Sequence, residues 1–164
     1  MPRTLKGALI ALMLGLSSCA PPGAPYGSVA ATVPAVPAGS ARIYFYRELE
    51  IYDSTTPTEA YLNGAPVGLT ETGTVFYRDV APGQYTISVR SYGIFPYQFK
   101  TVVLRPGEIA YARIESLRSW VPCGGGGGRD GGGSTSGCEN TFVVVMIDPQ
   151  LAVGDMRDLR FISG

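Results

Sequence analysis

Side chains that could carry out catalysis are scarce in this chain. It has no histidine among its 164 residues, so Ser-His-Asp and Cys-His nucleophile systems and histidine-based metal sites are excluded. Carboxylates remain as acid–base groups, and glycoside hydrolysis would need two of them placed on either side of the scissile bond. The spacing of the acidic residues selects no such pair. We therefore expect no enzyme activity and no cofactor.

An acidic cluster follows the first predicted strand. Glu48, Glu50 and Asp53 lie within one stretch of six residues, and carboxylate oxygens are the ligands that calcium prefers. A solvated loop face is the favoured interpretation of these charges. Calcium binding is the alternative.

Aromatic side chains gather between two later strands. Tyr92, Phe95 and Tyr97 stand in a loop that also contains glycine and proline, and Trp120 follows further along the chain. Together these rings could form a platform for a sugar ring or for a partner protein. The favoured interpretation is a loop folded back on the domain.

The N-terminus has the layout of a secretory signal. Arg3 and Lys6 precede an apolar run at 8–16, which is too short for the roughly 20 residues of a membrane-spanning helix. The run ends in Leu16-Ser17-Ser18-Cys19, a stretch that resembles the lipobox of bacterial lipoproteins. The resemblance implies that residues 1–18 are a signal peptide and that Cys19 carries the lipid. An ordinary cleaved signal is the alternative.

The same resemblance implies a place in the cell envelope. Residue 20 is alanine and not the aspartate that retains such proteins in the inner membrane, so we expect an outer-membrane anchor and a domain facing the periplasm. Loss of Arg3 and Lys6 leaves 11 basic residues against 13 acidic ones, a net charge of −2. A chain of this charge is unsuited to phosphate backbones, and we expect no nucleic-acid partner.

Cys123 and Cys138 remain as a pair once Cys19 carries lipid. They enclose fourteen residues, of which nine are glycine. An oxidising compartment favours a disulfide that closes this loop, with a stabilisation of about 3 kcal/mol from loop closure. A zinc site would need further ligands, a redox dithiol usually has closer spacing, and a phosphate-binding loop needs a G-K-S/T sequence.

Residues 19–40 are rich in proline, alanine and glycine and contain no charged side chain. This composition predicts a disordered, partly stiff linker, which would hold a folded domain up to about 65 Å from the lipid. Ordering of the segment against the domain is the alternative. The folded domain is then expected at 41–164, with a glycine-rich insertion at 123–138.

Strands account for most of that domain. Runs of β-branched and aromatic residues, and alternation of apolar with polar residues, predict strands. Asn63-Gly64 predicts a tight hairpin, and the Pro-Gly pairs at 82–83 and 106–107 predict type II turns. The predicted strands are 42–47, 58–62, 67–70, 74–80, 85–89, 98–104, 109–115 and 142–147.

The last predicted strand is apolar on both faces, so it should lie in the middle of a sheet or be covered on its second face. A short C-terminal helix could be that cover, because Asp148 and Pro149 form a typical N-cap and first position. Leu151, Met156 and Leu159 would form its apolar stripe. The fold class expected is all-β, an antiparallel β-sandwich of about seven to eight strands with a short C-terminal helix.

Two segments carry a family resemblance. The stretches EAYLNGAPVG at 59–68 and VAPGQYTISV at 80–89 resemble PEGA-type β-sandwich domains. The wider pattern behind the lipobox resembles uncharacterised bacterial envelope lipoproteins grouped as a domain of unknown function. These motifs are mostly turns and imply no catalytic residue. We expect a non-enzymatic module that docks an envelope protein, with binding of envelope glycan such as peptidoglycan as the alternative.

Overall fold

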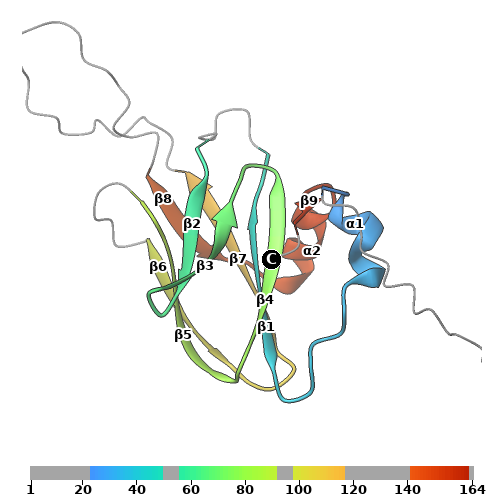
Figure 1. Ribbon diagram of the computed structural model, residues 1–164, viewed down its shortest axis with the longest axis vertical. Coiled ribbons are helices and arrows are strands. Elements are labelled where there is room, and N and C mark those ends of the chain that lie inside the picture. The colour runs from blue at the N-terminus through green and yellow to red at the C-terminus, as the bar shows by residue number, and fades with distance from the viewer. Residues whose placement is uncertain (1–22, 50–55, 92–97, 117–140, 163–164) are drawn as a thin grey trace, which may run out of the picture.

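The computed structural model describes residues 23–49, 56–91, 98–116 and 141–162. Its strands form two sheets packed face to face, so the predicted β-sandwich is confirmed (Figure 1). Sheet A has the strand order β8-β7-β1-β4-β9, and sheet B has the order β3-β2-β5-β6. The strands are β1 (Ala41–Arg47), β2 (Thr58–Leu62), β3 (Ala65–Thr70), β4 (Thr74–Val80), β5 (Gly83–Val89), β6 (Phe99–Leu104), β7 (Ile109–Ser116), β8 (Phe142–Met146) and β9 (Arg160–Phe161).

Three short helical elements accompany the sheets, namely α1 (Tyr26–Val29), the 3-10 turn η1 (Ala30–Thr32) and α2 (Pro149–Met156). All of them lie on the side of sheet A that faces away from sheet B (Figure 1). No helix among the described residues has the length and apolar character needed to span a membrane.

The predicted strands are all present, and only the two-residue β9 was not predicted. The hairpin between β2 and β3 is also confirmed, because Asn63 and Gly64 have φ values of 50° and 81°, as a type I′ turn requires. The Arg105–Glu108 turn is closed by a 3.1 Å bond from the Glu108 amide to the Arg105 carbonyl, and Gly107 has the expected positive φ of 82°.

The Pro82-Gly83 step differs from its prediction. Gly83 has a φ of 157°, which is far from the value near 80° of a type II turn. The reason is topological, because this step carries the chain from β4 in sheet A to β5 in sheet B. The two strands it connects are not hydrogen-bonded to each other.

The sandwich is not purely antiparallel. β1 pairs antiparallel with β4 but parallel with β7, and the short β9 is parallel to β4. β8 lies at the edge of sheet A, so the first of the two alternatives for this apolar strand, a place in the middle of a sheet, is wrong. Val143, which points away from the core residues Phe142 and Val144, is nevertheless buried, in line with the other alternative, a covered second face. The strand that is buried along its whole length is instead β1.

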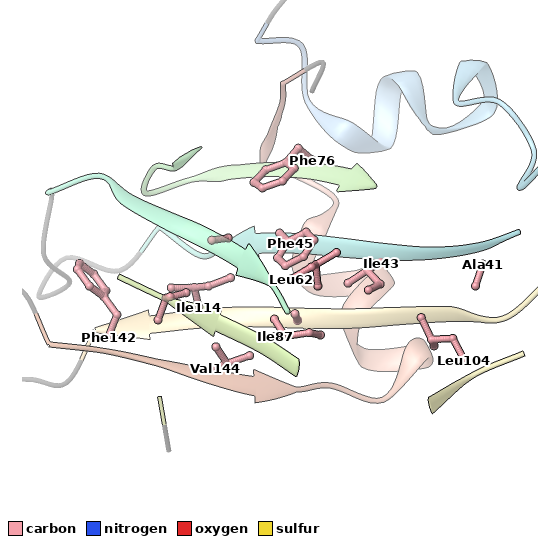
Figure 2. Close-up of a cluster of buried hydrophobic side chains, with 13 residues drawn as sticks. Ala41, Ile43, Phe45, Leu62, Phe76, Ile87, Leu104, Ile114, Phe142 and Val144 are labelled. Carbon is pink, nitrogen blue, oxygen red and sulfur yellow. The ribbon is translucent and has the colours of Figure 1, made fainter. Parts of the chain in front are cut away.

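Between the sheets lies the main hydrophobic core (Figure 2). Alternate residues of β1 point into it, with Phe45 stacked on Phe76 of β4 at 5.1 Å between ring centroids. Sheet B contributes Leu62 and Ile87, while β7 and β8 contribute Ile114 and Val144. Burial of these side chains, at about 25 cal/mol per Å² of apolar surface, holds the two sheets together.

A second core lies on the opposite face of sheet A. Tyr44 and Tyr46 of β1 pack there against Ala152 and Met156 of α2. The predicted helix start is confirmed, since the Asp148 carboxylate accepts a 2.9 Å hydrogen bond from the Gln150 amide. The predicted stripe is partly wrong, because Leu151 is 66% exposed while Ala152, Met156 and Leu159 are buried.

Residues 23–40 form a strap along the domain. The Tyr26 amide donates to the Leu159 carbonyl at 2.7 Å, and the Gly27 amide donates to the Arg157 carbonyl at 2.8 Å. Val29 of the strap is buried. The expectation of a disordered linker up to residue 40 is therefore wrong for 23–40, and residues 19–22 lie outside the described part. Hydrogen bonds from the C-terminal segment compensate the polar backbone of the strap.

Candidate functional site

Polar and aromatic side chains gather on the outer face of sheet A. Residues at every second position of β1 share one face of the sheet, which places Arg42, Tyr44 and Tyr46 away from sheet B. The parallel neighbour β7 places Tyr111 opposite Tyr44 and Arg113 opposite Tyr46. The face thus carries a row of tyrosines with a charged group at each end.

The tyrosines form one aromatic cluster. The Tyr44 and Tyr111 rings are stacked at 5.4 Å, and Tyr77 of β4 lies 5.6 Å from Tyr44 on the other side. Tyr26 of the strap meets Tyr44 edge-on, and its hydroxyl donates to the Tyr44 hydroxyl at 3.0 Å. Burial raises the pKa of Tyr26 and of Tyr111 above the ordinary value for a phenol. These phenols stay protonated at neutral pH and are unsuited to act as bases.

Arg42 closes one end of the row. Its guanidinium makes a two-pronged contact with the Asp79 carboxylate, at 2.6 Å from Nε and 2.9 Å from Nη2. Its Nη1 donates to the Pro34 carbonyl of the strap at 2.7 Å, and the group lies 3.8 Å from the centre of the Tyr77 ring. Arg42 therefore joins β1, β4 and the strap.

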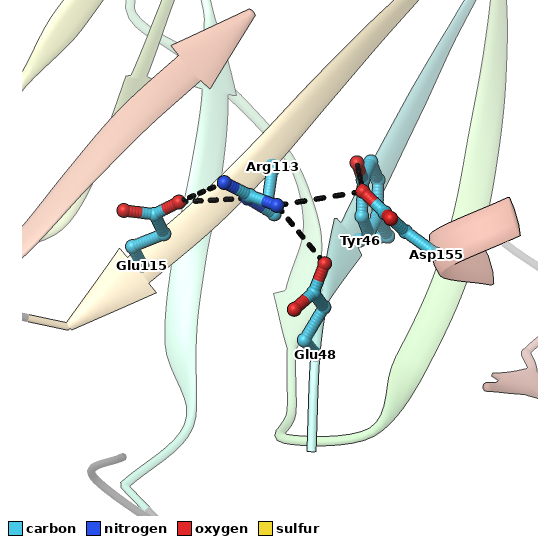
Figure 3. A network of polar contacts seen from close by, with 5 residues as sticks. All are labelled: Tyr46, Glu48, Arg113, Glu115 and Asp155. Atoms are coloured by element: carbon cyan, nitrogen blue, oxygen red, sulfur yellow. Dashed lines mark hydrogen bonds and ion pairs between the residues drawn. The ribbon is translucent and has the colours of Figure 1, made fainter. Parts of the chain in front are cut away.

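Arg113 forms the charged group at the other end (Figure 3). Its Nη1 lies 3.0 Å from the Glu48 carboxylate and 3.4 Å from that of Asp155, and its Nη2 lies 2.6 Å from Glu115. The Tyr46 hydroxyl also donates to Asp155, at 2.8 Å. This Arg113 network connects the end of β1, β7 and α2.

The charges of the network do not balance. One guanidinium faces three carboxylates, so each carboxylate is only partly compensated. The pKa of the Glu48 carboxyl is raised, first by burial and then by the negative charge of Asp155, while Arg113 acts in the opposite direction. Burial and the bond to Asp155 also raise the pKa of Tyr46. Glu48 and Tyr46 therefore hold their protons more readily than the same groups do in water.

The position of Arg113 determines whether the network could bind a cation. Its guanidinium occupies the position between the carboxylates that a bound cation would need. Within the described ranges, no group of three histidine, cysteine, aspartate or glutamate side chains is placed so that it could hold a metal ion. The contacts of Glu48 and Asp155 instead fix α2 against sheet A, which is a structural task.

Replacing Glu48 by glutamine should change how stability depends on pH. A carboxyl whose pKa is raised in the folded state favours folding while it is protonated, and this advantage is lost as the pH rises through the raised value. The wild-type protein should therefore lose stability relative to Glu48→Gln over a pH range that begins near the ordinary glutamate pKa of 4.5 and extends above it. Urea unfolding of both proteins across this range measures the difference, and parallel curves would contradict the assignment.

Of the acidic cluster, only Glu48 falls within the described residues, and it is ion-paired with Arg113 at the end of β1. The remaining sequence-predicted site residues lie outside the described part of the chain. They are Cys19, Glu50, Asp53, Tyr92, Phe95, Tyr97, Trp120, Cys123 and Cys138.

Sequence reasoning missed Arg113 and Asp155. One signal was present, since Arg113 and Glu115 are two positions apart in a strand and therefore share a face. The contribution of Asp155 depends on α2 docking over β7, which no local pattern encodes.

Comparison with known proteins identifies a family for this fold. A family model described as a protein of unknown function, DUF2846, matches residues 37–128. No curated protein matches the chain. The matched region contains β1 to β7, which are the whole of sheet B and the central strands of sheet A. Since it covers more than half of the 164 residues, the chain belongs to the DUF2846 family.

Proposed function

We propose that the protein is a lipid-anchored module of the cell envelope, held at the outer membrane by Cys19 and facing the periplasm. The observation that carries the proposal is the stretch Leu16-Ser17-Ser18-Cys19 at the end of a short apolar run. Two or three acyl chains on one residue would give stable attachment, because each buried methylene contributes about 0.8 kcal/mol.

The contacts of the chemical groups among the described residues support a non-enzymatic role. Burial raises the pKa of the Tyr26 and Tyr111 phenols, and both rings pack against Tyr44. The carboxylates of Glu48, Glu115 and Asp155 are engaged by Arg113. Groups that are committed to mutual contacts hold a scaffold in shape and are not available to a substrate. The resemblance of residues 59–68 in the β2–β3 hairpin and of residues 80–89, which include all of β5, to PEGA-type domains is part of the same proposal.

Metabolic labelling with a fatty-acid probe tests the anchor. The wild-type protein should incorporate the probe and sediment with membranes, and Cys19→Ser should abolish both, because the proposed attachment joins a diacylglycerol to the Cys19 sulfur as a thioether. Cys123→Ser is the matched control, and it should be labelled like the wild type. Labelling that persists in Cys19→Ser would overturn the proposal.

In-cell crosslinking of the acylated protein then identifies the class of partner. Crosslinks to an envelope protein support the interaction module. Retention on purified peptidoglycan that is lost in Tyr97→Ala and Trp120→Ala would overturn it in favour of envelope-glycan binding.

A further inference from the structure

The first described residues are pinned to the C-terminal strand. The Gly23 amide donates to the Phe161 carbonyl at 3.2 Å, and the Phe161 amide donates to the Ala24 carbonyl at 2.8 Å. Pro25 also forms a β-bridge with Arg160. The start of the strap is therefore fixed to β9 and cannot swing away from the domain without breaking these bonds.

The consequence for an anchored chain is a very short tether. Only Cys19 and residues 20–22 precede Gly23, and a fully extended chain spans at most about 3.6 Å per residue. The point at which the domain leaves the lipid is thus within about 14 Å of Gly23. A linker that was free to residue 40 would have allowed several times that distance.

The surface around Gly23 is suited to lie on a headgroup layer. The strap has no charged side chain, and exposed small residues such as Ser28 and Ala31 cover its outer side. Beside it, α2 exposes Leu151 and Val153, and apolar side chains of this kind insert into the boundary between headgroups and acyl chains. In Figure 1, α1 and α2 lie beside β9, the edge strand of sheet A, and sheet B lies on the other side of the molecule.

We propose that the face formed by the strap, α2 and β9 rests on the headgroup layer of the membrane that carries the anchor. This orientation relies on the proposed acylation of Cys19. The outer surface of sheet B is then turned away from the bilayer. The strap sets the orientation, since it converts a long flexible segment into part of the folded domain.

Energy transfer from two positions on the domain to the membrane tests the orientation. Val153 on α2 is 54% exposed and Val103 on β6 is 68% exposed, so either can be replaced by p-azidophenylalanine and coupled to a donor dye. The mature acylated protein, which begins at Cys19, is reconstituted in vesicles that contain a headgroup-labelled acceptor lipid. Two layer spacings, from α2 to sheet A and from sheet A to sheet B, separate the two probes, and each spacing is about 10 Å. Transfer should be several-fold more efficient from position 153.

A strap variant provides the control for this experiment. A Cβ atom on Gly27 would lie 2.9 Å from Cγ and 3.0 Å from the carbonyl oxygen of Arg157, so Gly27→Val should undock the strap. The difference between the two probe positions should then shrink markedly. Ala31→Val places the same side chain at an exposed strap position and should keep the difference.

The outcomes separate this inference from the anchor on which it rests. Protein that floats with the vesicles but transfers equally from both positions, or better from position 103, overturns the orientation alone. A probe difference that survives Gly27→Val also overturns it, because the strap would then not set the orientation. Protein that fails to float with the vesicles overturns the anchor, and the orientation with it.

Discussion

Replacing Arg42 by alanine should lower the free energy of unfolding by about 3–4 kcal/mol. The Arg42 side chain is only 3% exposed, and its removal leaves the Asp79 carboxylate without its two-pronged partner. The Pro34 carbonyl also loses its donor, so the strap should loosen together with the sheet. The expected loss of free energy is at the lower end of the range for a buried ion pair, because Asp79 is 28% exposed and can regain some hydration. Urea unfolding of the mature domain measures the loss.

The matched control is the Arg90–Glu59 pair on sheet B. Its 2.7 Å separation is as short as that of the Arg42 pair, but the Arg90 side chain is 73% exposed. Water and salt screen such a pair almost completely. Arg90→Ala should therefore leave the unfolding curve unchanged within error. Equal losses from the two arginines would show that burial does not determine the contribution of these ion pairs.

Local sequence patterns were sufficient for the strands and most of their turns. Asn63-Gly64 and Pro106-Gly107 place glycine where the backbone needs a positive φ, and that requirement acts within four residues. Alternation of apolar and polar residues in 85–89 likewise reports one buried face. Such signals are local, so most of them hold whatever the rest of the chain does. The Pro82-Gly83 step is the exception, because the chain passes there from sheet A to sheet B.

The pairing of strands that lie far apart in the sequence could not be predicted from local patterns, for a physical reason. β1 and β7 are parallel neighbours. Five strands, β2 to β6, lie between them along the chain. No residue of Ala41–Arg47 specifies whether its second neighbour is parallel or antiparallel. The outer face of sheet A depends on this choice, because it brings Arg113 to Tyr46. The candidate site was therefore predicted only through Glu48, and its ion pair was not predicted.

The strap was mistaken for a linker because its composition has two interpretations. Proline and alanine without charge suit an extended tether, but the same absence of charge lets the segment lie on a protein surface at little desolvation cost. The segment docks on the domain because its backbone amides find hydrogen-bond acceptors near the C-terminus, the carbonyls of Arg157 and Leu159.

Replacing Met156 by alanine should cost about 2–4 kcal/mol in the free energy of unfolding. Met156 is fully buried between α2 and the tyrosines of sheet A, and a shorter side chain leaves a cavity there. Leu151→Ala in the same helix removes a comparable apolar side chain that is 66% exposed, so its cost should stay within about 0.5 kcal/mol. Both residues lie outside the 37–128 region that the family model matches. A large difference between the two variants, measured by urea unfolding with one cooperative transition, means that α2 is a full layer of the domain. If the two losses were equal, α2 would not be docked by its Ala152–Met156 side, and the second core on sheet A would have to be abandoned.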